Sequence, residues 1–399
     1  MEQRICVNFA FPVHFTQDLF AERNPVFVET VSRLERDKRH RVVFVIDDNV
    51  AAAHPGLIPS INRYFTAHAE GLELVAPPTL VPGGEGVKND IAHVLGLVEL
   101  VHRHGVDRHS FMAIVGGGAV LDMACFAAAI AHRGIRAIRI PTTVLAQGDS
   151  AVGVKNAINL FGKKNFIGTF LPPFAVLNDS NFLTTLSHRD KIAGMAEAIK
   201  VALIRDRTFF QYLEANRARM AQADMEVLTH LIRRSAEIHM NHIRTSGDPF
   251  EFGSARPLDF GHWAAHKMES LTQNRLRHGE AVALGMAMDT RYSVKAGLLS
   301  PNQSERIISL LQTLGFRLWE DELLSRDEMG KLEVLQGLRE FREHLGGTLH
   351  ITLLRDIGDG VEVNEMDEAL VLESIHWLRD RYERHAQGTG ARAATMVSG

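Results

Sequence analysis

The sequence predicts an α/β protein in which an N-terminal, Rossmann-like parallel-sheet domain precedes a mostly α-helical C-terminal domain. In the first half, short apolar runs alternate with helical segments, which is typical of parallel strands joined by crossover helices. After about residue 180, a 3.6-residue periodicity dominates, and strand-like runs nearly vanish until residues 349–354. The chain has 399 residues, which is comfortable for two hydrophobic cores. We therefore expect domains at residues 1–180 and 181–385, followed by a small, polar tail, residues 386–399, that is disordered.

Apolar runs and helical periodicity place the main elements. The apolar runs predict strands at residues 42–46, 72–75, 111–115 and 137–140. The periodicity predicts helices at residues 189–204, 225–242 and 262–271. In open parallel sheets, ligands bind beyond the carboxyl ends of the strands. The residues that follow each strand are therefore the first candidates for a binding site.

Three glycines follow the third predicted strand directly. Gly116, Gly117 and Gly118 would let a helix N-terminus approach a pyrophosphate closely, where its free N–H groups bind anions. Their spacing is not that of the common GxGxxG fingerprint, so a tight strand-to-helix turn is the alternative. Other strand ends favour a dinucleotide, because the first strand ends in Asp47, a charged glycine turn lies at residues 82–88, and the fourth strand precedes two threonines.

The helical half carries a charged pair on an apolar helix face. Glu197 and Lys200 are three residues apart, and their neighbours are apolar, so this face is expected to be buried. A buried charged pair requires a partner such as a metal or an anionic ligand. The alternative is a surface ion pair.

Histidines at helical spacing suggest a metal site. His262 and His266 are four residues apart, and His278 follows shortly after. Zinc and related cations bind imidazole nitrogens and a carboxylate, and catalytic sites leave one position open. Chance pairs are expected among 20 histidines, however, and the absence of HExxH argues against a metalloprotease.

Residues 149–155 and 162–165 are rich in groups that bind phosphate. Lysines and the amide donors of glycine-containing loops suit an anionic ester. The alternative is a flexible, solvated loop.

Composition excludes several classes of protein. The net charge of −4 gives no indication of a nucleic-acid partner. Two distant cysteines, Cys6 and Cys125, form no disulfide framework and fit a reducing compartment. The N-terminus lacks the pattern of a signal peptide, and no apolar run approaches the roughly 20 residues of a membrane span. We expect a cytoplasmic protein without a membrane partner.

Taken in order, these segments resemble the dehydroquinate synthase-like sugar phosphate cyclases over about residues 40–355. The motifs that carry the resemblance lie at residues 82–88 (PGGEGVK), 116–122 (GGGAVLD), 133–134 (RG), 141–143 (PTT), 149–155 (DSAVGVK), 162–165 (GKKN), 194–200 (GMAEAIK), 260–262 (FGH) and 278–280 (HGE). The resemblance implies a homodimeric carbon–oxygen lyase that uses NAD and one divalent metal, zinc or cobalt. Such enzymes oxidise a sugar phosphate transiently with NAD, eliminate phosphate, return the hydride and close a carbocycle by intramolecular aldol addition.

The resemblance also implies roles for individual residues. The metal ligands would be Glu197, His262 and His278. The NAD site would comprise Asp47, Glu85, Lys88, Gly116, Gly117, Gly118, Asp122, Thr142 and Thr143, with Lys155 and Lys164. The catalytic set would be Asp149, Lys155, Lys200, Asp259 and the phosphate-side His266. The substrate and its phosphate would also be held by Lys164, Asn165, His239, Arg256 and an arginine that reaches into the neighbouring subunit, Arg133.

Departures from dehydroquinate synthase indicate a different substrate. That enzyme holds its substrate carboxylate with a lysine and an arginine before the first metal histidine. Here His239 lies near the expected lysine, Arg256 is one place out of register, Asp259 replaces an asparagine, and residues 342–347 lack the usual paired lysines. Fewer cations and an added acid should repel a carboxylate.

These departures favour a sugar phosphate without a carboxylate, such as sedoheptulose 7-phosphate, and the 2-epi-valiolone synthase branch. The alternatives are a divergent 3-dehydroquinate synthase, a metal-dependent polyol dehydrogenase and a non-catalytic descendant of the fold.

Overall fold

The computed structural model describes residues 2–4, 7–250, 258–344 and 347–397, and the chain forms two compact units. The first unit comprises residues 1–191 and 239–255, and the second comprises residues 192–238 and 256–399. The sequence suggested a single boundary near residue 180. The return of residues 239–255 to the first unit carries no signal in composition, because the chain passes from one unit to the other within a continuous helix, α10 (Met225–Thr245).

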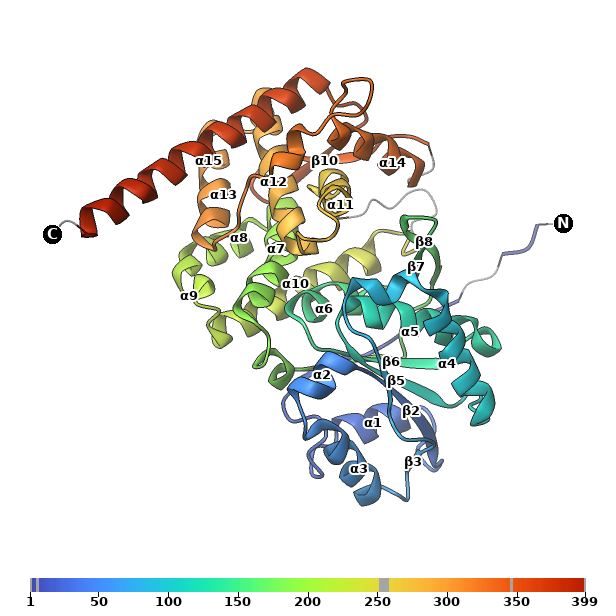
Figure 1. The fold of residues 1–399 in the computed structure, drawn as a ribbon. Coiled ribbons are helices and arrows are strands. Elements are labelled where there is room, and N and C mark those ends of the chain that lie inside the picture. Colours follow the sequence, from blue (N-terminus) through green and yellow to red (C-terminus); the bar gives the residue numbers. More distant parts are fainter. Residues whose placement is uncertain (1, 5–6, 251–257, 345–346, 398–399) are drawn as a thin grey trace. The chain divides into compact units, whose positions relative to one another are not determined.

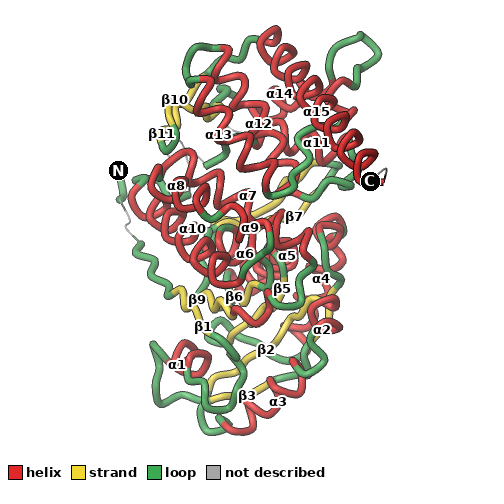
Figure 2. The backbone as a smooth tube through the Cα atoms, turned by 90° about the vertical axis from the view of Figure 1, so that its left-hand side faces the viewer, coloured by secondary structure: helices red, strands yellow, loops and turns green. Residues whose placement is uncertain are grey.

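A parallel sheet forms the centre of the first unit (Figures 1 and 2). Its order is β1-β9-β6-β5-β2-β3, with β4 paired to β2. The strands are β1 (Val13–Thr16), β2 (His40–Asp47), β3 (Leu72–Leu74), β4 (Thr79–Val81), β5 (Phe111–Gly116), β6 (Arg136–Pro141) and β9 (Ala175–Asp179). Each pairing in this sheet is parallel, which confirms the predicted α/β class.

Both faces of this sheet are covered. Phe44 of β2 and Phe111 of β5 share a core with Phe27 and Tyr64 of two helices, while the residues that alternate with them along the strands are also buried. The helices of the unit are α1 (Val26–Ser32), α2 (Asp48–Ala53), α3 (Leu57–Ala67), α4 (Ile91–Arg103), α5 (Gly118–Ile130) and α6 (Val144–Gly148). Short 3-10 helices lie at η1 (Glu85–Asn89), η2 (Ala131–Arg133), η3 (Ser150–Val152) and η4 (Ser180–Leu183).

An antiparallel hairpin follows the loop that the sequence analysis singled out. It consists of β7 (Lys155–Leu160) and β8 (Lys163–Phe170), and it pairs Lys155 with Phe170. The hairpin was not predicted, because charged residues and glycine interrupt its apolar pattern.

The second unit is mostly helical, as predicted. Its helices are α7 (His188–Arg205), α8 (Arg207–Ala215), α9 (Arg217–Ala221), α10, α11 (His262–Leu271), α12 (His278–Lys295), α13 (Pro301–Thr313), α14 (Gln336–His344) and α15 (Glu368–Val397). A two-stranded sheet joins β10 (Ile351–Asp356) to β11 (Asp359–Val363), and 3-10 helices lie at η5 (Asp321–Leu324) and η6 (Glu333–Leu335).

Two expectations about whole segments can be compared with the structure. The tail from residue 386, for which we expected disorder, continues α15 as far as Val397. Among the described residues, no helix is long and apolar enough to span a membrane.

Candidate active site: a metal centre and a dinucleotide site

The second unit brings Glu197, His262 and His278 together from three helices, α7, α11 and α12. One ligand atom from each lies within 4.8 Å of the others. Glu197 Oε1 is 3.4 Å from His262 Nε2 and 3.1 Å from His278 Nε2. A tetrahedral cation with ligands at about 2.0 Å separates its ligand atoms by about 3.3 Å, so this set fits zinc or a similar ion. Two imidazoles and one carboxylate leave a fourth position open for a substrate.

The second oxygen of Glu197 faces a lysine. Lys200 Nζ lies 2.5 Å from Glu197 Oε2, and both side chains are almost fully buried. Burial alone would raise the pKa of Glu197, but the charges of Lys200 and His262 hold this pKa well below its usual range. Glu197 is therefore a carboxylate, the form that binds a metal. The prediction of a buried charged pair is confirmed.

His278 has a carboxylate on each side. Its Nδ1 lies 3.3 Å from Oε2 of the buried Glu269, and its Nε2 faces Glu197. Burial would lower the pKa of His278, but Glu269 and Glu197 raise this pKa to about 10. His266 lies in the same cluster, since its ligand atom is within 4.8 Å of those of Glu269 and His278. Glu269 was missed from the sequence, where nothing distinguishes it from a surface glutamate.

Close backbone packing brings these helices together. Gly261 has a φ of +81°, and a Cβ on Gly285 of α12 would lie 2.0 Å from its carbonyl oxygen. Asp289 of α12 accepts hydrogen bonds from Gly261 N (3.1 Å) and Trp263 Nε1 (3.0 Å), the residues on either side of His262. A Cβ on Gly279 would lie 1.8 Å from the carbonyl oxygen of Ala193 in α7. Glycine is thus required where the ligand-bearing helices touch.

In the first unit, the glycine turn fits a dinucleotide. Gly117 is the N-cap of α5, so the helix begins with free N–H groups at the end of β5. The hydroxyls of Thr142 and Ser150 are buried and lack a hydrogen-bond partner among the described residues. Asp47, at the end of β2, is buried, and this burial raises the pKa of its carboxyl group. The other threonine, Thr143, caps α6.

Charged residues predicted to bind NAD or phosphate form one network in the first unit. Lys88 Nζ lies 2.7 Å from Asp122 Oδ2, 2.5 Å from Asn165 Oδ1 and 3.9 Å from Glu85 Oε1. Lys164 Nζ is also 3.9 Å from Glu85 Oε1. Asn159, which sequence reasoning missed, links the parts: it donates to Glu85 and accepts a hydrogen bond from Asn165 N. These residues come from η1, α5 and the β7–β8 hairpin.

His239 belongs to the first unit, where it meets another predicted residue. Its Nδ1 lies 2.8 Å from Asp149 Oδ1. A Cβ on Gly153 would come within 3.6 Å of its Nε2, so the imidazole also packs on the loop that Asp149 begins. Lys155, at the other end of that loop, is exposed.

Three predicted residues lie elsewhere. Arg133 is exposed in the turn after α5 and has a φ of +63°. Asp259 is in the second unit; its backbone oxygen accepts a hydrogen bond from His262 N, and its side chain accepts one from Thr352 Oγ1. Arg256 falls outside the described residues.

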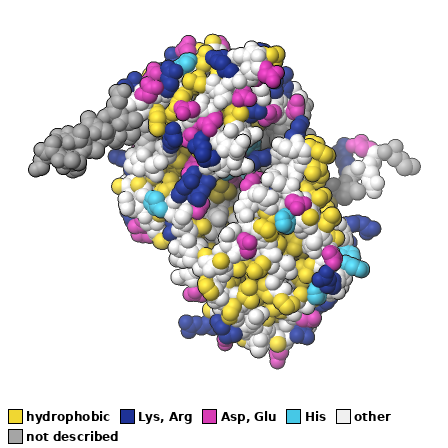
Figure 3. Space-filling view, viewed as in Figure 1, with side chains coloured by type: hydrophobic (Ala, Val, Ile, Leu, Met, Phe, Trp, Pro, Cys, Tyr) yellow, Lys and Arg dark blue, Asp and Glu magenta, His cyan; other side chains and the backbone are white. Residues whose placement is uncertain are grey.

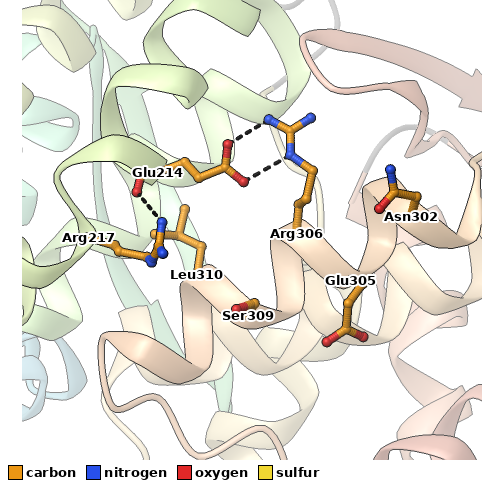
Figure 4. A pocket seen from close by; sticks show the side chains of 7 residues that line it. All are labelled: Glu214, Arg217, Asn302, Glu305, Arg306, Ser309 and Leu310. Carbon is orange, nitrogen blue, oxygen red and sulfur yellow. Dashed lines mark hydrogen bonds and ion pairs between the residues drawn. The ribbon is translucent and has the colours of Figure 1, made fainter.

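A pocket in the second unit contains none of the predicted site residues (Figure 4). Its volume is about 220 Å³, and the ion pair between Arg306 and Glu214 crosses one side of it. It is lined by Glu214, Arg217, Asn302, Glu305, Arg306, Ser309 and Leu310. Because the guanidinium is already paired with a carboxylate, the pocket is no competitor to the metal centre.

Fold and site together define a class of protein, the dehydroquinate synthase-like sugar phosphate cyclases. The model of the 3-dehydroquinate synthase N-terminal domain matches residues 78–193, and that of the C-terminal domain matches residues 194–334. The 3-dehydroquinate synthase of Paracoccus denitrificans is 36% identical over 338 residues, which are 84% of this chain and 89% of that protein. The chain therefore belongs to the 3-dehydroquinate synthase family.

Solved structures with the same fold include enzymes named for other products. A 2-epi-5-epi-valiolone synthase, ValA of Streptomyces hygroscopicus subsp. jinggangensis, has a TM-score of 0.83 and 26% identity, covering 96% of this chain and 100% of that one. It was solved with NAD+ and Zn²⁺ bound. A 2-deoxy-scyllo-inosose synthase, complexed with carbaglucose-6-phosphate, NAD+ and Co²⁺, has a TM-score of 0.73 and 24% identity over 92% of this chain and 96% of that one, a likeness of fold alone.

Proposed function

We propose that this enzyme converts sedoheptulose 7-phosphate to a carbocyclic cyclitol such as 2-epi-valiolone and releases phosphate. The proposal includes NAD and one divalent cation, zinc or cobalt. The family membership supports a cyclase, and the cofactors bound in the valiolone synthase structure support NAD and a cation. The donor set of Glu197, His262 and His278 fits the cation, and the glycine turn before α5 fits the dinucleotide.

Asp259 is the observation that carries the choice of substrate. It is 91% buried, since its exposed fraction is 9%, and its backbone is hydrogen-bonded to the metal-ligand candidate His262. Its charge contributes to raising the pKa of the neighbouring Asp289 to about 8, after burial, which is the larger cause. Asp259 would repel a substrate carboxylate beside it. It would not repel a hydroxyl group, because a hydroxyl can donate a hydrogen bond to Asp259.

The residues of the chain would divide the chemical work. A divalent cation supplies Lewis acidity toward a substrate hydroxyl, and NAD supplies reversible hydride acceptance. Lys200, held by Glu197, would donate to substrate oxygens where negative charge develops. Asp149, held by His239, would orient the reacting hydroxyls, and an acid so placed accepts their hydrogen bonds.

Cations and amide groups of the chain would hold the phosphate. Lys164 and Asn165 belong to the network around Lys88, so their positions are already fixed by hydrogen bonds and ion pairs. Lys155 would add a further cation, His266 would bind on the side of the metal centre, and Arg133 would come from a second subunit.

We include a cytoplasmic homodimer in the proposal. Figure 3 shows hydrophobic side chains gathered on the surface of the first unit, and several apolar side chains there are about half exposed, among them Leu80, Leu95 and Ile91. Such side chains suit a subunit interface. The one described cysteine, Cys125, is free and buried, as expected in a reducing compartment.

A second candidate is 3-dehydroquinate synthase activity, which the 36% identity to the Paracoccus denitrificans enzyme favours. A polyol dehydrogenase is less well supported, because the matched family is a cyclase family and the chain has the residues that we propose to bind phosphate.

Separate assays with the two substrates distinguish the two candidate functions. Purified enzyme with catalytic NAD and Co²⁺ or Zn²⁺ would receive sedoheptulose 7-phosphate and the heptulosonate substrate of dehydroquinate synthase separately, and released phosphate would be measured. We expect release from the first only. Asp259→Asn should raise the relative use of the heptulosonate, because it removes a negative charge and restores the amide of dehydroquinate synthase. Release from the heptulosonate alone by the wild type would overturn the proposed substrate and establish the second candidate.

A further inference from the structure

A fully buried arginine lies under the loop that carries two of the proposed substrate-binding residues. Arg139 of β6 is 2% exposed, and no carboxylate pairs with it among the described residues. Its guanidinium is instead surrounded by neutral acceptors. Burying an unpaired charge is expensive, so each of its donors must find a good partner for the fold to tolerate it.

The partners of Arg139 are concentrated in one loop. Its Nη1 donates to the carbonyl oxygens of Ala151 (2.9 Å) and Gly153 (2.7 Å). Its Nη2 donates to the carbonyl oxygen of Lys155 (3.2 Å) and to Asn156 Oδ1 (2.8 Å). One side chain thus binds three alternate carbonyls of a five-residue segment.

Two further hydrogen bonds connect Arg139 and its partner Asn156 to other elements of the unit. Arg139 Nε donates to Cys125 Sγ of α5 at 3.4 Å. Asn156 passes the connection to β8, because its Nδ2 donates to Thr169 Oγ1 at 3.3 Å. The loop is therefore tied to the sheet, to α5 and to the β7–β8 hairpin through one residue.

The loop fixed in this way begins at Asp149 and ends at Lys155. Residues 151–154, between these two side chains, are buried, and the guanidinium binds two of their carbonyl oxygens. The loop also touches the glycine turn, since a Cβ on Gly118 would lie 2.9 Å from Ser150 Oγ. A shift of this loop would therefore move an acid, a cation and a neighbour of the dinucleotide turn together.

We propose that Arg139 is a positioning residue for sugar phosphate binding, acting through the loop of residues 149–155. The inference rests on the proposed function for the identity of the ligand. The planar guanidinium presents five N–H groups in a fixed fork, and a lysine, with one rotating ammonium group, cannot reach the same four oxygens. Arg139 should act on how the substrate is held rather than on the metal or on the fold alone.

The test compares Arg139→Lys with Arg136→Lys. Arg136 lies on the same strand, but it is paired with a carboxylate, Glu35, so its replacement is a matched control. We expect Arg139→Lys to lower kcat/KM for the sugar phosphate about 100-fold, chiefly through KM, because misplacement by about 1 Å has effects of this size. Arg136→Lys should leave kcat/KM unchanged.

Two further measurements separate positioning from general damage. Amide hydrogen exchange of residues 150–156, measured without substrate, should become faster in Arg139→Lys while that of β5 and β2 stays as in the wild type. Asn156→Ala, which removes one of the four oxygens, should change KM in the same direction by a smaller factor, and it serves if Arg139→Lys does not fold.

The inference would be overturned by wild-type KM in Arg139→Lys, or by a fall in kcat/KM that follows only the loss of folded protein. A wild-type enzyme that is inactive on both sugars would refute the proposed function. Amide exchange in the loop requires no substrate, so it would still test whether Arg139 positions the loop. Unchanged loop exchange in Arg139→Lys and Asn156→Ala would refute the positioning role, whatever the substrate.

Discussion

The two oxygens of Glu197 have different partners, and this division would allow one carboxylate to bind both a metal and a lysine. Oε1 faces both histidines, and Oε2 faces Lys200. The ammonium group keeps Glu197 ionised in a buried place, and the carboxylate fixes the ammonium group. Neither charge would be tolerated there alone, since leaving one buried charge unpaired costs several kcal/mol.

Glu269 should control metal affinity without binding the metal. A proton on His278 Nδ1 shared with Glu269 leaves Nε2 free to bind a cation. We expect Glu269→Ala to weaken Co²⁺ binding about 10- to 100-fold, as replacements of such outer carboxylates do. Titration of metal-free protein with Co²⁺, followed by visible absorption, measures this affinity.

The control for this experiment is Glu373→Ala, which removes an exposed partner of Lys295 near the start of α15. It should bind Co²⁺ like the wild type. Wild-type affinity in Glu269→Ala would show that Glu269 has no part in the metal centre.

At the residue scale, the sequence could predict side chains that belong to motifs and could not predict those that support them. Glu197, His262 and His278 stand in recognisable patterns, and the structure brings their ligand atoms together. Glu269 and Arg139 stand on a helix and a strand where a charged residue usually faces solvent, and only the tertiary structure shows that they are buried.

At the scale of elements, the junction between α11 and α12 has a built-in pH dependence. Asp289 is fully buried beneath the start of α11, and burial, assisted by the charge of Asp259, raises its pKa to about 8. Its unfolded pKa is about 3.9. The folded state therefore holds a proton that the unfolded state has lost, and this contribution to stability decreases as the pH rises from about 4 to about 8.

Asp289→Asn should reduce this pH dependence. In the wild type, this group should lower the free energy of unfolding, measured with urea, by about 1 kcal/mol for each pH unit between pH 5 and pH 8. The variant should be less stable at pH 5, because Gly261 N and Trp263 Nε1 donate to different oxygens of Asp289, and an amide has only one oxygen. The difference should shrink at pH 8. Parallel pH profiles for the two proteins would contradict the account of Asp289.

Element prediction succeeded where periodicity was strong. The helix expected at residues 262–271 matches α11, and the four predicted strands correspond to β2, β3, β5 and β6. Strands β1, β4 and β9 of the parallel sheet were not predicted. Strand β9 has five buried residues, whereas β1 and β4 have only four and three residues and are largely half-exposed. Such short strands are stabilised by their neighbours in the sheet rather than by their own sequence.

At the scale of the whole molecule, the proposed homodimer makes a prediction about mixed subunits. If Arg133 completes the site of the neighbouring subunit, Arg133→Ala and His262→Ala homodimers should both be almost inactive. A dimer of one subunit of each kind would retain one intact site. Random co-assembly should therefore recover about a quarter of the wild-type activity.

This recovery is measured on the whole co-expressed protein, and the mixed dimer purified through two affinity tags should show about half of the wild-type activity. The two inactive homodimers mixed after folding are the control. No recovery in the purified mixed dimer would place Arg133 outside the neighbouring site. Sedimentation would show independently whether the enzyme is a dimer.

In the proposed reaction, the enzyme oxidises and reduces the same sugar phosphate within one catalytic cycle. The most direct test supplies sedoheptulose 7-phosphate in large excess over NAD with Co²⁺ or Zn²⁺, and follows the product by NMR and NADH by absorbance. We expect complete conversion to a carbocycle with phosphate release and no accumulation of NADH. NADH formed in proportion to product, or a product that is not a carbocycle, would contradict it.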